Sequence, residues 1–152
     1  MTERTTPAST VRFTSRLVAT NAAAVSHVIL PLISDEHVVA VRRLVRERAL
    51  EIKLSLVDQT KLVTAASELA RNTIKYGGGG EVHVVCRSDG VRLAFADDGP
   101  GIADVAMALT DGYTTGGGLG LGLSGAKRLV DAFDIDTQPG QGTIVVIEKW
   151  KR

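Results

Sequence analysis

Three short segments constrain this chain more than its composition does. They are Glu68-Leu69-Ala70-Arg71-Asn72, Asp97-Asp98-Gly99-Pro100-Gly101 and the glycine-rich run at residues 116–123. Glu68 and Asn72 are four residues apart, which places them on the same face of a helix. Asp97 follows a predicted strand, and the glycine-rich run precedes a predicted helix. In this order the three segments indicate a site for a nucleotide and its metal ion.

The hydrophobic pattern predicts an α+β fold. Apolar residues at helical spacing predict helices at residues 35–51, 55–76 and 119–133. Runs rich in β-branched residues predict strands at residues 28–33, 81–87, 91–96, 135–137 and 143–150. Ser34 or Asp35, and the Ser55-x-x-Asp58 pair, can cap the first two helices, while Pro31 confines the first strand to a sheet edge. We expect a two-layer sandwich, in which a mixed, mainly antiparallel sheet is covered on one face by about three helices.

Length and charge describe a single domain without a strongly charged surface. The 152 residues carry a formal net charge of +1, which does not favour nucleic acid or a membrane as a partner. No apolar run approaches the roughly 18 residues that a membrane-spanning helix needs. Cys86, the single cysteine, lies in an apolar strand and is expected to be a core residue of a cytoplasmic protein.

The first 27 residues differ from the rest of the chain. They are rich in Thr, Ser and Ala, they contain Arg4, Arg12 and Arg16, and no acidic residue occurs between Glu3 and Asp35. A flexible tail and a transit peptide both have this composition. We expect residues 1–27 to be a flexible tail and residues 28–152 to be the functional domain.

The pair on the second predicted helix suits phosphate chemistry. The Asn72 carbonyl is a hard oxygen ligand of the kind that Mg²⁺ accepts together with phosphate oxygens and water. The Glu68 carboxylate can take a proton from an attacking hydroxyl, and Lys75 on the same side could offset phosphate charge. An exposed helix face with an ordinary Glu-Asn pair is the alternative for this pattern alone.

The other two segments suit the base and the phosphates. A carboxylate at Asp97 can accept a hydrogen bond from the exocyclic amine of adenine, and Gly99 and Gly101 let the backbone approach a ligand closely. Residues 102–117 are expected to form a weak helix and then a mobile loop. The glycines at 116–122 would offer successive N–H groups that end at a helix N-terminus. A plain turn and a flexible linker are the alternatives, although leucines interspersed among the glycines argue against a linker.

Other nucleotide-binding motifs do not fit. The Gly120-x-Gly122-x-x-Gly125 pattern lacks the preceding strand of a dinucleotide-binding fold. The H-R-D and D-F-G segments of eukaryotic-type kinases and the P-loop are absent from the sequence. His37 is expected on the surface and His83 on the outer face of a strand, so neither suggests the phosphoacceptor of a histidine kinase.

Taken together, the segments resemble the GHKL family, which has the Bergerat ATP-binding fold of gyrase-type ATPases, Hsp90, MutL and histidine kinases. The resemblance covers roughly residues 28–152. Its motifs are Glu68 to Asn72 as the N-box, Asp97-x-Gly99-x-Gly101, the glycine box Gly118 to Leu123, and the closing Gly142-Thr143. The ending Ile-Glu-Lys-Trp and the Glu-Leu-Ala-Arg-Asn segment further resemble RsbT-type serine/threonine switch kinases of the stressosome and, more distantly, anti-sigma factor kinases.

The resemblance implies a role for each site residue, with ATP and Mg²⁺ as cofactors. Asn72 would bind Mg²⁺, Glu68 would be the catalytic base, Lys75 would reach phosphate, and Tyr76 would contact the nucleotide. Asp97 would contact adenine with support from Thr143. The lid hinge and phosphate cradle would be Gly116, Gly117, Gly118, Leu119, Gly120, Leu121 and Gly122.

The implied activity is transfer of the ATP γ-phosphate to a Ser or Thr of a STAS-domain protein in a partner-switching pathway that controls a sigma factor. The resemblance also implies that the kinase activates a downstream PP2C-type phosphatase. The alternative is an anti-sigma factor or nucleotide-gated adaptor, which sequesters a sigma factor or phosphatase without catalysis. Glu68 speaks against the adaptor, which has no use for a base.

Overall fold

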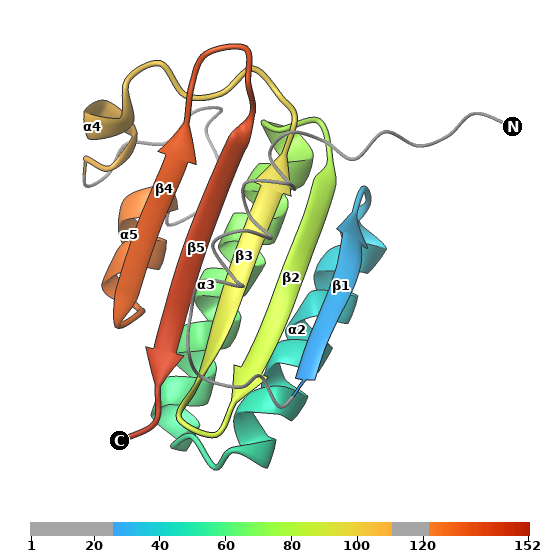
Figure 1. Cartoon of the computed structure of the whole chain (residues 1–152), viewed down its shortest axis with the longest axis vertical. Helices are drawn as coiled ribbons and strands as arrows, with labels where there is room; N and C mark the ends of the chain where they lie inside the picture. Colours follow the sequence, from blue (N-terminus) through green and yellow to red (C-terminus); the bar gives the residue numbers. More distant parts are fainter. Residues whose placement is uncertain (1–25, 111–121) are drawn as a thin grey trace, which may run out of the picture.

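The apolar faces of the helices and strands pack together to form two layers. One is a five-stranded sheet, and the other is a layer of helices on one face of that sheet (Figure 1). The computed structural model describes residues 26–110 and 122–152. In chain order the elements are β1 (Ser26–Leu32), α2 (Asp35–Glu51), α3 (Leu56–Lys75), β2 (Gly80–Arg87), β3 (Gly90–Asp97), α4 (Val105–Ala108), α5 (Gly122–Arg128), β4 (Ala132–Thr137) and β5 (Thr143–Trp150). The predicted α+β sandwich is confirmed. Residues 1–25 lie outside the described part, so the expectation of a flexible tail stays a prediction.

The strand order in the sheet is β1-β2-β3-β5-β4, and every pairing among the described strands is antiparallel. β1, which contains Pro31, is an edge strand as predicted. The central pairing of β3 with β5 joins two hairpins and sets Asp97 opposite Thr143. Two residues that are far apart in the sequence therefore lie side by side at one end of the sheet.

The core lies between the helices and one face of the sheet. In β2, the helix-facing side chains of Val82, Val84 and Cys86 are at most 1% exposed, which confirms Cys86 as a core residue. The helices contribute the apolar residues Val41, Val45, Ala49, Leu62, Ala66, Leu69, Ala70, Leu123 and Ala126. Burying each Val or Leu side chain contributes about 1.5–3 kcal/mol, so these residues hold α2, α3 and α5 on the sheet.

Both long helices begin where the sequence predicts. The Ser55 hydroxyl accepts a hydrogen bond from the Asp58 backbone N–H at 3.1 Å. Ser34 is the N-cap residue of α2, and His37 Nδ1 lies 3.1 Å from the Ile33 nitrogen and 3.2 Å from the Ser34 nitrogen, accepting from both. His37 therefore holds the start of α2, because it satisfies two backbone donors next to the helix N-terminus.

The last helix differs from the prediction. The sequence pattern predicts a helix over 119–133 with Phe133 in its apolar stripe, whereas α5 ends at Arg128 and β4 begins at Ala132. Phe133 pairs with Ile147 of β5 and packs against the core from a strand. Pairing with the buried strand β5 outweighs the local helical spacing, which is a weak preference in a short segment.

Among residues 26–110 and 122–152, no helix is both long enough and apolar enough to cross a membrane.

Candidate functional site

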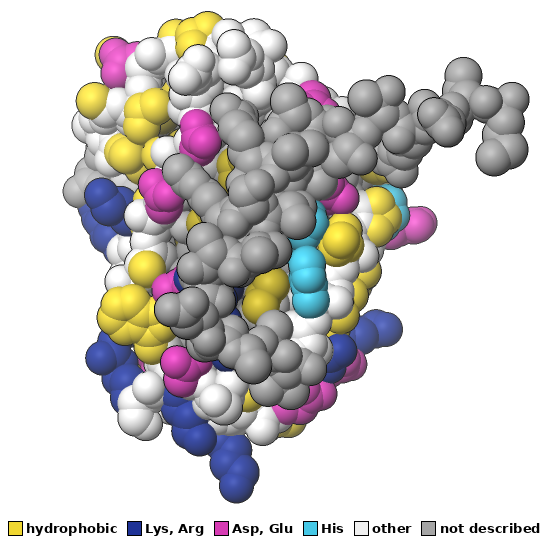
Figure 2. Space-filling view, in the orientation of Figure 1, with side chains coloured by type: hydrophobic (Ala, Val, Ile, Leu, Met, Phe, Trp, Pro, Cys, Tyr) yellow, Lys and Arg dark blue, Asp and Glu magenta, His cyan; other side chains and the backbone are white. Residues whose placement is uncertain are grey.

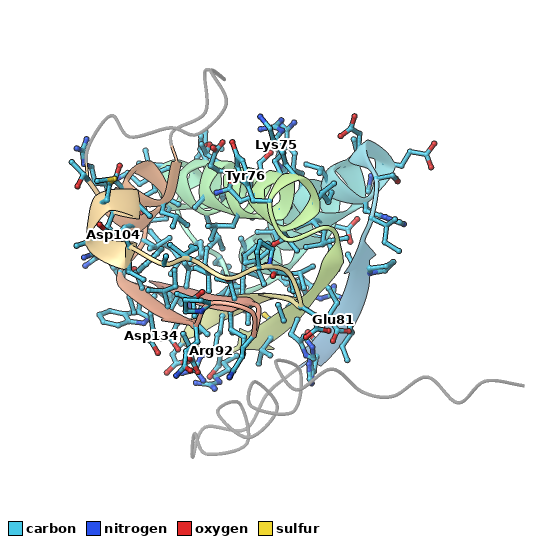
Figure 3. The ribbon with its side chains drawn as sticks, turned by 90° about the horizontal axis from the view of Figure 1, so that it is seen from above. Lys75, Tyr76, Glu81, Arg92, Asp104 and Asp134 are labelled. Carbon is cyan, nitrogen blue, oxygen red and sulfur yellow. The ribbon has the colours of Figure 1, made fainter. Side chains whose placement is uncertain are left out.

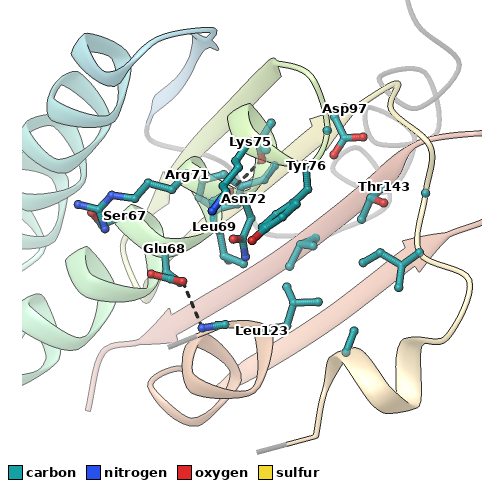
Figure 4. A pocket seen from close by; sticks show the side chains of 18 of the residues that line it. Ser67, Glu68, Leu69, Arg71, Asn72, Lys75, Tyr76, Asp97, Leu123 and Thr143 are labelled. Atoms are coloured by element: carbon teal, nitrogen blue, oxygen red, sulfur yellow. Dashed lines mark hydrogen bonds between the residues drawn. The ribbon is translucent and has the colours of Figure 1, made fainter. Parts of the chain in front are cut away.

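A cavity of about 1000 Å³ opens beside α3 at the end of the sheet where β3 terminates (Figure 4). Its walls come from α3, the end of β3, residues 100–108, the start of α5 and the start of β5, and α2 contributes Arg42. Eight of the predicted site residues line it: Glu68, Asn72, Lys75, Tyr76, Asp97, Gly101, Gly122 and Thr143. This volume is at the upper end of the range of small-molecule sites, which is roughly 300–1,000 Å³.

The polar wall of the cavity comes from one face of α3. Glu68, Asn72 and Lys75 follow the i, i+4, i+7 spacing, while Leu69 on the adjacent face is 1% exposed in the core. Tyr76 follows directly as the C-cap residue, with the Lys75 ammonium 5.2 Å from its ring centroid. Figure 3, which looks onto the end of the sandwich, places Lys75 and Tyr76 on the helix side of the sheet.

The Glu68 carboxylate connects α3 to the start of α5. The Gly122 backbone N–H donates to Glu68 Oε1 at 3.1 Å (Figure 4). Gly122 has a φ of +66°, a left-handed conformation that glycine adopts without strain. Glu68 therefore contacts the C-terminal end of the glycine-rich run, at the first residue of α5.

Asp97 forms the other end of the cavity and is only 8% exposed. Burial raises the pKa of its carboxyl above the usual value, and the nearby Asp98 carboxylate acts in the same direction. The backbone N–H groups of Gly99 and Thr143 oppose this rise; Gly99 donates to Asp97 Oδ1 at 2.9 Å. A largely buried carboxylate held by backbone donors is suited to accept a hydrogen bond from a ligand amine.

Glycines make room for Asp97 on two sides. A Cβ on Gly77 would lie 2.4 Å from Asp97 Cγ, and a Cβ on Gly142 would lie 2.1 Å from the Asp97 carbonyl oxygen. Gly99 is packed against Gly77, where a Cβ would lie 2.7 Å from the Gly77 carbonyl oxygen. Gly101 lines the cavity, whereas Gly99 does not. Gly99 instead helps to position the Asp97 side chain, to which its backbone N–H donates.

A hydroxyl pair holds Thr143 beside Asp97. Thr143 Oγ1 and Thr137 Oγ1 are hydrogen-bonded at 2.8 Å, and the Ile102 backbone N–H donates to Thr137 Oγ1 at 2.9 Å. These contacts join β5, β4 and the segment after β3. Thr137 was not a predicted site residue, because its contribution depends on strand pairing that no local motif reveals.

Sequence reasoning also missed part of the cavity lining. The additional polar residues are Arg42, Thr64, Ser67, Arg71, Thr73 and Asp104, and the apolar walls include Phe95, Ile102, Met107, Leu123 and Val145. Arg71 lies inside the first predicted segment, so a signal for it existed. Arg42 reaches the cavity from α2, which only the packing of α2 against α3 places there. The predicted cradle residues 116–121 lie outside the described residues.

The donors present suit a metal ion that arrives with a phosphate ligand. In the parts of the chain that the structure describes, no group of three or more His, Cys, Asp or Glu side chains could hold a metal ion. The Asn72 amide could supply one hard oxygen ligand. Mg²⁺ bound to nucleotide phosphates needs few protein ligands and keeps several waters, so these residues fit it.

Residues 57–152 match the family described as histidine kinase-, DNA gyrase B-, and HSP90-like ATPase. The chain belongs to this family. Membership implies the use of ATP and confirms the resemblance to the GHKL family. The match spans nearly all of α3, both hairpins and α5, which supply most of the cavity lining.

The chain is also similar to known regulators. It is 40% identical over 125 residues to serine/threonine-protein kinase RsbT of Bacillus subtilis (strain 168), covering 80% of this chain and 94% of that protein. It is 33% identical over 95 residues to an anti-sigma F factor of Clostridium beijerinckii, covering 57% of this chain and 66% of that protein. The RsbU and RsbW domains of Rv1364c from Mycobacterium tuberculosis superpose with a TM-score of 0.58 at 21% identity, over 84% of this chain and 32% of theirs, and support the fold alone.

Proposed function

We propose that this protein is an ATP-dependent serine/threonine kinase that phosphorylates a STAS-domain regulatory protein in a partner-switching pathway of sigma-factor control. One observation carries the proposal. Glu68 and Asn72 of α3 share a cavity with the buried Asp97. They do so in a chain that is 40% identical to a serine/threonine-protein kinase, over 94% of the length of that kinase. The proposal includes binding and activation of a downstream PP2C-type phosphatase.

The cavity has two chemically different ends that match the two ends of ATP. Asp97 accepts a hydrogen bond from the adenine amine, with the Thr143 hydroxyl beside it. Gly77, just after the end of α3, abuts Asp97, and Glu68 lies seven residues before the last helical residue Lys75, about 10 Å along the helix axis. This separation leaves room for the ribose and the phosphate chain between the adenine ring, at Asp97, and the carboxylate of Glu68.

The α3 wall supplies the groups for phosphoryl transfer. Asn72 would hold Mg²⁺, which would neutralise charge on the phosphates. Lys75 would add positive charge beside the phosphates, and Tyr76 would contact the nucleotide. Glu68 would accept the proton of the substrate hydroxyl as that hydroxyl attacks the γ-phosphate.

A second candidate function is that of an anti-sigma factor or nucleotide-gated adaptor. The 33% identity to an anti-sigma F factor favours it. The two functions share the ATP site and differ in whether Glu68 is used as a base. The presence of Glu68 in the cavity beside Asn72 favours the kinase.

The test is a transfer assay with γ-labelled ATP and Mg²⁺ against the STAS-domain proteins of the same genome. We expect label on a Ser or Thr of one of them, and none when Mg²⁺ is chelated. Stable co-elution with an unmodified partner in the presence of ATP, without transfer, would instead support the adaptor.

The raised pKa of Asp97 predicts how ATP binding depends on pH. An ionised carboxylate makes the stronger hydrogen bond to the adenine amine, so affinity is expected to fall as the pH drops through this pKa. Because the pKa is raised, the fall begins at a higher pH than for an ordinary aspartate. Calorimetric titration with ATP at several pH values measures this change in affinity. The Asp97→Asn variant is the control for protonation of ATP itself, and an identical pH profile in that variant would contradict the assignment.

A further inference from the structure

The sheet has an apolar strip on the face opposite the helices. Ala94 and Ala96 of β3 and Ile144 of β5 form a second buried cluster, separate from the core, with Val146 packed against it. These side chains alternate with the core-facing residues of the same strands, so they point away from α2, α3 and α5 (Figures 1 and 3). Among residues 26–110 and 122–152, no helix lies on this face.

Charged side chains border the strip, and carboxylates outnumber guanidinium groups there. The outward-facing acidic residues are Glu81 of β2, Asp134 and Asp136 of β4, and Glu148 of β5, and the outward-facing basic residues are Arg87 and Arg92. Arg92 is paired with Glu148. Figure 2 shows this face, with acidic side chains over β4 and hydrophobic and histidine side chains over β1 and β2. The face therefore combines an apolar centre with a net negative rim.

The first 25 residues have the complementary composition. They carry three arginines against the single acidic residue Glu3, and they include the apolar residues Val11, Phe13, Leu17, Val18 and Val25. The segment ends directly before Ser26, where the edge strand β1 begins. Even as a helix, 25 residues would extend about 37 Å. The five strands have six to eight residues, so the sheet spans at most roughly 24 by 26 Å. The segment is long enough to cross the whole face.

We propose that residues 1–25 fold back onto this outer face of their own chain. Their apolar side chains would pack on Ala94, Ala96, Ile144 and Val146, and their arginines would lie near the acidic residues of β4. A second copy of the chain is the less suitable occupant, because pairing two copies of this face would bring two net negative surfaces together. The proposal concerns the face opposite the helices and does not depend on the kinase assignment.

Cross-linking in the full-length protein tests the proposal. In a Cys86→Ala background, Ser15→Cys is combined with Val146→Cys on the strip, and a short thiol-reactive cross-linker is added. We expect a cross-link within one chain, with a yield that does not change with protein concentration. Mixing isotopically labelled and unlabelled chains before digestion and mass spectrometry separates links within a chain from links between chains.

The matched control replaces Val146→Cys with Val39→Cys, an exposed position on α2 that is on the opposite side of the molecule. We expect it to cross-link at no more than one tenth of the yield of the test pair. Equal yields in the two pairs, links only between chains, or no link in either pair would overturn the proposal.

Limited chymotrypsin cleavage after Phe13 gives a measurement that needs no cysteine. The Arg12→Glu, Arg16→Glu variant is expected to be cut about threefold to fivefold faster than the unmodified chain, because its attraction to the acidic rim is reversed. The Arg43→Glu change on α2 reverses one exposed charge outside the proposed contact and is expected to leave the rate unchanged. A rate that is the same in all three proteins would count against the contact.

Discussion

Replacing Glu68 with Gln is expected to lower the rate of phosphotransfer by about 10²–10⁴-fold while ATP binding persists. The amide has the same shape, and its oxygen can still accept the Gly122 N–H bond that Glu68 Oε1 accepts at 3.1 Å. What the variant loses is the ability to take a proton from the attacking hydroxyl. The substitution therefore separates proton transfer from the architecture of the site.

Single-turnover phosphoryl transfer to the unphosphorylated STAS-domain substrate measures the first effect, and calorimetric titration of ATP measures the second. Glu47→Gln is the matched control, because Glu47 is an exposed carboxylate on α2 outside the cavity lining, and no change is expected. Full activity in Glu68→Gln would exclude Glu68 as the base. A parallel loss of ATP affinity would show instead that Glu68 acts by holding the start of α5.

Removing the Asn72 amide is expected to have the second large effect. Asn72→Ala should lower phosphotransfer by at least about 100-fold, because loss of the metal position removes several kcal/mol of charge stabilisation from the transition state. Asn72→Asp keeps an oxygen ligand and adds a charge. We expect it to retain more activity than the alanine variant, with a changed dependence on Mg²⁺ concentration.

A Mg²⁺ titration of ATP binding and of transfer, carried out on both variants, measures this prediction. Circular dichroism and thermal unfolding serve as the folding controls, since the amide projects into the cavity and not into the core. If both variants keep the Mg²⁺ dependence of the unmodified protein, Asn72 does not hold the metal.

The long helices and the hairpins could be predicted because their information is local. The apolar spacing of 55–76 specifies one buried face, and the Ser55 cap specifies where α3 begins, which the structure confirms. The segment around Phe133 could not be predicted in the same way. Its spacing is compatible with a helix, and only its pairing with Ile147 makes it a strand.

The same distinction applies to the site. Helical geometry alone puts Glu68 and Asn72 on one wall, and the residue types alone suggest phosphate and metal chemistry. Their convergence with Asp97 depends on the position of α3 over β3, and the support of Thr143 by Thr137 depends on the β4–β5 register. The Arg42 contribution depends on helix packing across the core.

Short-range periodicity and motif chemistry were thus enough to specify most of the helices and strands, the use of ATP, and several of the polar residues that line the cavity. The tertiary structure alone decided which surfaces meet: the burial that raises the pKa of Asp97, the bond from Gly122 to Glu68, and the apolar strip on the outer face of the sheet. The physical reason is that backbone geometry relates residues within a few positions of one another. Contacts between distant segments are selected by the burial of the whole core.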